Sequence, residues 1–106
     1  MLKVIEGSQL EDIEYPGFHR SGLVESDYYQ FLLESQRYFE SEDFSEDKGI
    51  KIMSKNAYYI WVDYKMCVRV YKDGDIYRMD GTGFHRAYVA KKYGLKILVD
   101  VKEQTT

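Results

Sequence analysis

The residues best suited to chemistry lie together near the end of the chain, in the stretch DGTGFHRAYVAKKYG at positions 80–94. Gly81 and Gly83 allow the backbone to bend sharply where a side chain would block it. The residues that follow read as a helix, and the first N–H groups of a helix are unpaired and carry partial positive charge. His85 and Arg86 would add side-chain donors at that point. The stretch therefore predicts a binding site for an anion such as phosphate.

The quartet GFHR occurs twice, at residues 17–20 and 83–86, and the two copies contain the only histidines of the chain. Gly22 follows the first copy closely and disfavours a helix there. The sequences around the two copies do not match. We therefore interpret the duplication as a coincidence and not as an internal repeat.

A structural role is the alternative interpretation of the second quartet. His85 and Arg86 would then cap the helix region and pair with Asp80 or with a nearby carbonyl group. The chain offers no cysteine cluster and no carboxylate spacing typical of a metal site, so no metal ligands are assigned.

The elements that must position this stretch follow from apolar periodicity and turn residues. A helix is predicted at residues 28–39, because Ser26 and Asp27 suit a helix start and large apolar side chains then recur at helical spacing. A second helix is predicted at about residues 84–93, with Gly94 closing it. Segments rich in β-branched and aromatic residues predict strands at 2–7, 50–54, 57–64, 66–79 and 95–101, with a hairpin turn at KDGD, residues 72–75.

The composition limits the possible classes of protein. A chain of 106 residues with 44% hydrophobic residues predicts one domain, residues 1–106, with a single core. The formal net charge is −3, whereas nucleic-acid-binding domains usually carry a basic surplus, so we do not expect nucleic acid as the main partner. No apolar run is long enough to span a membrane. The single cysteine, Cys67, excludes an internal disulfide and predicts a reduced, cytoplasmic protein.

A concentration of acidic residues stands out in the middle of the chain. The sequence ESEDFSED, residues 40–47, has five carboxylates in eight positions and no basic residue. We interpret it as a solvated loop. The alternative is a contact surface, because a carboxylate cluster can occupy a basic nucleic-acid channel of a partner protein.

The last 26 residues before the C-terminal tail carry a more specific pattern. IYRMDGTGFHRAYVAKKYGLKILVDV, residues 76–101, resembles the C-terminal motif of the ParB/sulfiredoxin-like superfamily: a strand, Asp-Gly, His-Arg, an alanine-containing helix and a strand. The earlier order of YPGFHRSGL and a helix at 28–39 is also similar to that superfamily. The resemblance implies an α+β fold in which a small mixed sheet is flanked by two main helices.

The resemblance also implies a nucleotide site. Relatives receive phosphates of ATP, ADP or CTP at the turn and helix start after Asp-Gly, which here corresponds to Gly81, Thr82, Gly83, His85 and Arg86. Arg20 is a further implied contact, since an early arginine of the superfamily often faces the same pocket. Sulfiredoxin has its catalytic cysteine immediately before His-Arg, and this chain has Phe84 there. We therefore do not expect reduction of a sulfinic acid.

Three functions from different classes are compatible with these observations. The first is a nucleotide- or phosphate-binding domain, as a phosphotransferase or nucleotide hydrolase, with or without Mg²⁺, in which Asp80 would orient a hydroxyl group or water. The second is an acidic interaction protein from a phage or mobile element that inhibits a host nucleic-acid enzyme through residues 40–47. The third is a DNA-associated domain of the partition type, which the acidic composition disfavours.

Overall fold

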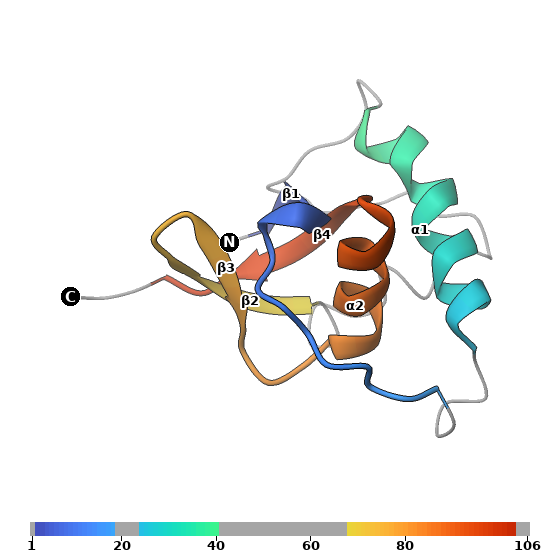
Figure 1. Ribbon diagram of the computed structural model, residues 1–106. Coiled ribbons are helices and arrows are strands. Elements are labelled where there is room, and N and C mark those ends of the chain that lie inside the picture. The colour runs from blue at the N-terminus through green and yellow to red at the C-terminus, as the bar shows by residue number, and fades with distance from the viewer. Residues whose placement is uncertain (1, 19–23, 41–67, 104–106) are drawn as a thin grey trace.

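The computed structural model describes residues 2–18, 24–40 and 68–103, which form a small α+β domain. A four-stranded sheet has the strand order β1-β4-β2-β3, and two α-helices lie on one side of it (Figure 1). The elements in chain order are β1 (Leu2–Glu6), the 3-10 helix η1 (Gly7–Gln9), α1 (Glu25–Phe39), β2 (Val68–Asp73), β3 (Ile76–Met79), α2 (Phe84–Tyr93) and β4 (Lys96–Val101). The predicted mixed sheet with two main helices is confirmed.

The sheet is mixed because β4 pairs differently with its two neighbours. It runs antiparallel to β1 and parallel to β2. The parallel pair requires a crossover, which the β2–β3 hairpin and α2 provide. Gly74 has φ of 63° in the hairpin turn, as expected for the KDGD sequence. The strands predicted at 50–54 and 57–64, like Cys67, lie outside the described residues.

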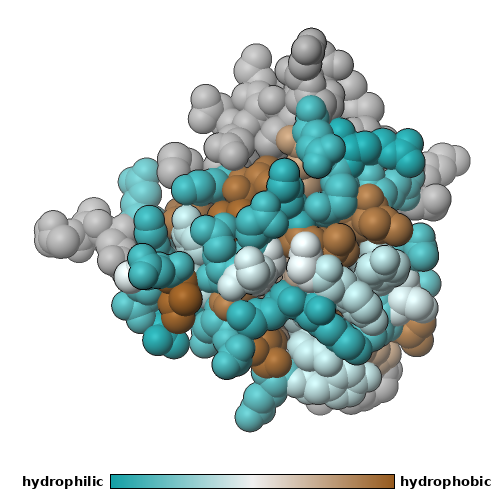
Figure 2. All heavy atoms as spheres, turned by 45° about the horizontal axis from the view of Figure 1, so that its top comes forward, coloured by the Kyte–Doolittle hydropathy of each residue, from teal (hydrophilic) through white to brown (hydrophobic). Residues whose placement is uncertain are grey.

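The core lies between the sheet and the helices. On α2, Ala87 and Ala90 are fully buried, and their small side chains allow the helix to lie close to the sheet. The sheet contributes branched residues to this core, including Val68, Val70, Ile97 and Val99. α1 packs beside α2 (Figure 1) and buries Leu32 completely. Hydrophilic side chains cover much of the described surface in Figure 2.

The two helices begin in different ways. α1 begins at Glu25, and the Asp27 carboxylate accepts a hydrogen bond of 2.8 Å from the N–H of Val24. The helix predicted at residues 28–39 therefore begins three residues earlier than expected, because Asp27 caps it from its third position and not from in front of it. α2 has the predicted bounds, and Gly94 closes it with φ of 64°. No helix in the described part of the chain is long and apolar enough to cross a membrane.

One buried hydroxyl group in α1 gives a test of this packing. The Oγ of Ser35 is fully buried and has no hydrogen-bond partner among the described residues. We expect Ser35→Ala to stabilise the domain by about 1 kcal/mol, because alanine removes an unpaired polar group and favours the helix. Urea unfolding measures the change, with Ser26→Ala on the exposed side of the same helix as control. A loss of stability in Ser35→Ala would contradict the described packing.

A polar contact links the start of α1 to the end of α2. Glu25 lies 3.0 Å from Lys92 Nζ and accepts a hydrogen bond of 2.8 Å from the Tyr93 hydroxyl. The hydrogen bond from Lys92, followed by that from Tyr93, holds the pKa of Glu25 below its ordinary value of 4.5. This stabilisation is present above the unfolded-state pKa and is lost as the pH falls through the lower folded-state pKa.

Removing the Glu25 charge therefore has a pH-dependent effect. At neutral pH we expect Glu25→Gln to lower the free energy of unfolding by less than about 1 kcal/mol, since the contact is partly exposed. The difference from the unchanged protein should shrink once the pH is well below 4.5. Urea unfolding at several pH values measures it. A difference that stays constant through this range would show that the carboxylate charge is not responsible.

Candidate functional site

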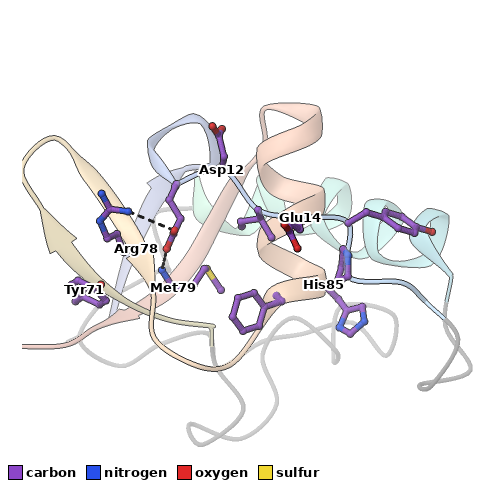
Figure 3. A pocket seen from close by; sticks show the side chains of 11 residues that line it. Asp12, Glu14, Tyr71, Arg78, Met79 and His85 are labelled. Atoms are coloured by element: carbon purple, nitrogen blue, oxygen red, sulfur yellow. Dashed lines mark hydrogen bonds and ion pairs between the residues drawn. The ribbon is translucent and has the colours of Figure 1, made fainter.

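A pocket of about 720 Å³ opens where the segment after η1 separates from the edge of the sheet. Leu10 forms a parallel bridge with Tyr77 of β3, and the Glu11 N–H donates to the Tyr77 carbonyl at 2.9 Å. Beyond this point residues 12–16 run away from β3. The space between them and the β3–α2 connection is lined by Glu11, Asp12, Ile13, Glu14, Tyr15, Pro16, Tyr71, Arg78, Met79, Phe84 and His85 (Figure 3).

Two charged residues at one end of the pocket neutralise each other. The Glu11 carboxylate accepts a hydrogen bond of 2.5 Å from the Met79 N–H and lies 3.7 Å from Arg78 Nη1 (Figure 3). Arg78 also contacts Asp73 at 2.5 Å, and this hydrogen bond raises the pKa of Arg78 above its ordinary value. Arg78 therefore lies between two carboxylates, those of Glu11 and Asp73. The Glu11 side chain also accepts the hydrogen bond of the Met79 N–H at the end of β3.

His85 is held rigidly at another part of the pocket wall. Its Nε2 lies 2.7 Å from the Gly17 carbonyl oxygen. The ring stacks on Tyr28 of α1, with centroids 5.7 Å apart and 15° between the planes. Phe18 meets it edge-on at 5.2 Å. These contacts join α2, α1 and the segment before α1 around one imidazole.

The connection into α2 combines two glycines that serve different purposes. A Cβ atom on Gly83 would lie 2.7 Å from Cγ2 and 2.8 Å from Cα of Val68, so this glycine permits close packing on β2. A Cβ on Gly81 would meet nothing within 4 Å. Both have positive φ, of 85° at Gly81 and 88° at Gly83. Gly83 precedes the first turn of α2, which has no acidic residue and which no side chain in the described part of the chain caps.

The predicted site residues occupy two distinct places. His85 lines the pocket, next to Phe84. The other predicted residues of this stretch precede or follow these two in the chain and do not line the pocket; they are Asp80, Gly81, Thr82, Gly83 and Arg86. The Asp80 N–H donates to the Arg69 carbonyl at 2.9 Å, which extends the β2–β3 hairpin. Arg20 lies outside the described residues.

The sequence did not indicate that carboxylates line the same pocket as Phe84 and His85. Glu11, Asp12 and Glu14 come from a segment far from α2 in the chain. Their charge is visible in the sequence LEDIEYP, but their place beside α2 depends on the parallel bridge between Leu10 and Tyr77, which no local pattern signals. Asp12 lies 3.7 Å from Lys91 Nζ on α2.

These carboxylates do not assemble a metal centre by themselves. Within residues 2–18, 24–40 and 68–103, no three side chains of the His, Cys, Asp and Glu types lie together as ligands. Comparison with protein-family models, with curated proteins and with solved structures finds no match to this chain.

Proposed function

We propose that the chain binds a small phosphate-bearing molecule such as ATP, ADP or CTP, with its phosphate at the start of α2 and the remainder in the pocket. The observation that carries this proposal is the contrast between the two helix starts. α1 has Glu25 and Asp27 in its first turn, and Asp27 bonds the backbone there. The first turn of α2 has no acidic residue, and no side chain of the described residues caps it. The partial positive charge of a helix start favours an anion.

The residues around the start of α2 suit a phosphate group. A Cβ atom on Gly81 would meet nothing within 4 Å, and Gly83 brings the backbone into the left-handed conformation that precedes the first turn. Arg86 belongs to that turn, and a guanidinium group there would add a charge-assisted contact to phosphate oxygens. Asp80 lies just before the turn, where a carboxylate would orient the attacking hydroxyl or water in a phosphotransferase or hydrolase.

The pocket suits the rest of such a ligand. Its volume of about 720 Å³ falls within the range of roughly 300–1,000 Å³ common for small-molecule sites. Tyr15 and Phe84 are exposed large aromatic residues on its wall, and aromatic faces stack on nucleobases. The carboxylates of Asp12 and Glu14 would favour a nucleotide that arrives with Mg²⁺, because this ion is usually bound by one or two carboxylates together with phosphates.

A ligand panel tests the proposal. Thermal unfolding is measured with inorganic phosphate, ADP, ATP and CTP, each with and without Mg²⁺, and with adenosine and cytidine as controls that lack phosphate. A nucleotide at a hundredfold excess over its Kd should raise the Tm by roughly 10 °C, since binding to the native state stabilises it by about 2.7 kcal/mol. The absence of any phosphate-dependent shift would contradict the proposal.

The interaction-protein alternative has little support from the described residues. Of the acidic sequence 40–47, only Glu40 is described, and its carboxylate lies 3.9 Å from Lys96 Nζ. That contact is an ordinary surface ion pair. The alternative therefore stays a prediction from the sequence.

A further inference from the structure

We propose that residues 12–16 and the pocket beside them form a docking surface for an extended basic peptide of a partner protein. The peptide would pair with the main chain of this segment and place a lysine or arginine side chain among the pocket carboxylates. This interaction goes beyond the proposed function, because it uses neither the start of α2 nor a phosphate group.

The main chain of residues 12–16 finds no hydrogen-bond partner among the described residues. Pairing with β3 ends at Glu11, whose N–H donates to the Tyr77 carbonyl at 2.9 Å. From Asp12 to Pro16, no N–H or carbonyl group bonds another residue in the described part of the chain. Pro16 also restricts the preceding residue, Tyr15, to extended backbone conformations. An extended segment with unpaired groups is a template to which a peptide can add as a strand.

The side chains of the pocket give it a negative charge. Within the described ranges, its lining has three carboxylates and one guanidinium group. That guanidinium group, Arg78, already contacts Glu11 and Asp73. The other two carboxylates are Asp12 and Glu14, which come from the segment that borders the pocket (Figure 3). The pocket therefore complements a basic side chain and repels an acidic one.

The carboxylates of Asp12 and Glu14 are both accessible to a ligand. Glu14 is exposed and forms no ion pair with any other described residue. Asp12 lies 3.7 Å from Lys91 Nζ, but its side chain is fully exposed, so this pair is weak. Lys91 Nζ also donates to the Leu10 carbonyl at 2.6 Å, and it would keep this partner when a ligand engages Asp12.

Two exposed aromatic side chains belong to the same pocket. Tyr15 is 64% exposed and Phe84 is 40% exposed. Such rings can cover the aliphatic stem of a lysine or arginine and attract its cationic end. A contact of this kind already occurs within the domain, where Lys92 Nζ lies 5.8 Å from the ring centroid of Tyr88 and 5.3 Å from that of Tyr93. The pocket therefore suits a long basic side chain.

The unpaired main chain favours a peptide over a free cation such as a polyamine. A peptide strand presents N–H donors and carbonyl acceptors in alternation, whereas a polyamine offers no carbonyl group to the N–H groups of residues 12–15. A strand also directs every second side chain to the same face. Basic residues at alternate positions would therefore meet the pocket carboxylates together.

Fluorescence anisotropy with labelled peptides tests the docking surface. The probe is an octapeptide of alternating threonine and arginine residues. In one control peptide citrulline replaces arginine, which removes the charge and keeps the shape. In another, every residue is N-methylated, which keeps the charge and removes the N–H donors. We expect the arginine peptide to bind and each control peptide to bind about tenfold more weakly or less, because ion pairing and main-chain pairing both contribute.

Matched double variants of the protein locate the bound peptide. Asp12→Asn with Glu14→Gln removes two pocket carboxylates and should weaken binding on the order of tenfold, since an exposed ion pair contributes up to about 1 kcal/mol. Asp75→Asn with Glu103→Gln changes the net charge equally at exposed positions outside the pocket lining. This control should change the affinity by less than about threefold at about 0.15 M salt, where distant charges are screened. The Tm of each variant confirms that it is folded.

Four results would overturn the proposal. The arginine peptide fails to bind, or the two double variants weaken its binding equally, which would indicate attraction to the overall negative charge. The fully N-methylated peptide binds as well as the unmodified one, which would exclude main-chain pairing. Spermidine displaces the peptide at equal concentration, which would make a free cation the occupant. The nucleotide panel uses other ligands, so the proposed function and this docking surface can fail separately.

Discussion

Replacing Gly7 with alanine is expected to destabilise the domain by at least about 3 kcal/mol, since forced overpacking of this kind lies at or beyond the upper end of the usual range. Gly7 is buried where η1 meets the end of α2, and its N–H donates to the Leu95 carbonyl at 2.8 Å. A Cβ atom there would lie within 2.8 Å of Leu95 O and closer still to the carbonyl group of Ala90. All of these are backbone atoms, so no side-chain rotation relieves the overlap.

Urea unfolding followed by circular dichroism measures this effect. Gly74→Ala is the matched control, because Gly74 has a positive φ of 63° but a Cβ atom on it would meet nothing within 4 Å. The control should lose only about 1–2 kcal/mol from backbone strain. If Gly7→Ala were no less stable than Gly74→Ala, the described contact between η1 and α2 would be wrong.

The second large effect concerns ligand affinity. Thr82→Glu places a carboxylate directly in front of α2, where the proposed phosphate lies. Two negative charges about 4–5 Å apart near a protein surface repel by about 3–4 kcal/mol, so the affinity for a nucleotide should fall by roughly two to three orders of magnitude. The stability of the folded protein should not fall, because a negative charge near a helix start usually contributes about 0.3–1 kcal/mol of stability.

Isothermal titration calorimetry measures this loss, and two controls isolate its cause. Thr82→Gln has nearly the same size without the charge and should keep most of the affinity. Gln30→Glu adds the same charge on the exposed surface of α1 and should also bind normally. An affinity of Thr82→Glu equal to that of these controls would place the phosphate elsewhere.

The parts of the fold that were predictable from sequence are those fixed by local signals. The bounds of α2 follow from the two glycines that flank it, Gly83 and Gly94, both in the left-handed conformation. The β2–β3 hairpin follows from Asp-Gly between two strand-like runs. The observed start of α1 differs from the predicted one because a carboxylate inside the helix, that of Asp27, reaches back to cap it. The sequence alone does not distinguish this arrangement from a capping residue that precedes the helix.

The candidate site was only half visible in the sequence. The glycines and the His-Arg pair at the start of α2 are adjacent in the chain, so the sequence alone was enough to propose them together. The hydrogen bond between Glu11 and Met79 and the contact between Gly17 and His85 each join residues 68 positions apart. Their encounter depends on the parallel bridge at Leu10 and on aromatic packing around His85, which are tertiary features without a local signature.

The central claim is that the first backbone N–H groups of α2 hold a phosphate. Titration of the ¹⁵N-labelled protein with ADP and Mg²⁺, followed through backbone amide signals, tests it most directly. The account predicts that the amides of Gly83, Phe84, His85 and Arg86 shift most and that adenosine leaves them in place. Unchanged signals for these four amides, while others in the domain shift, would contradict it.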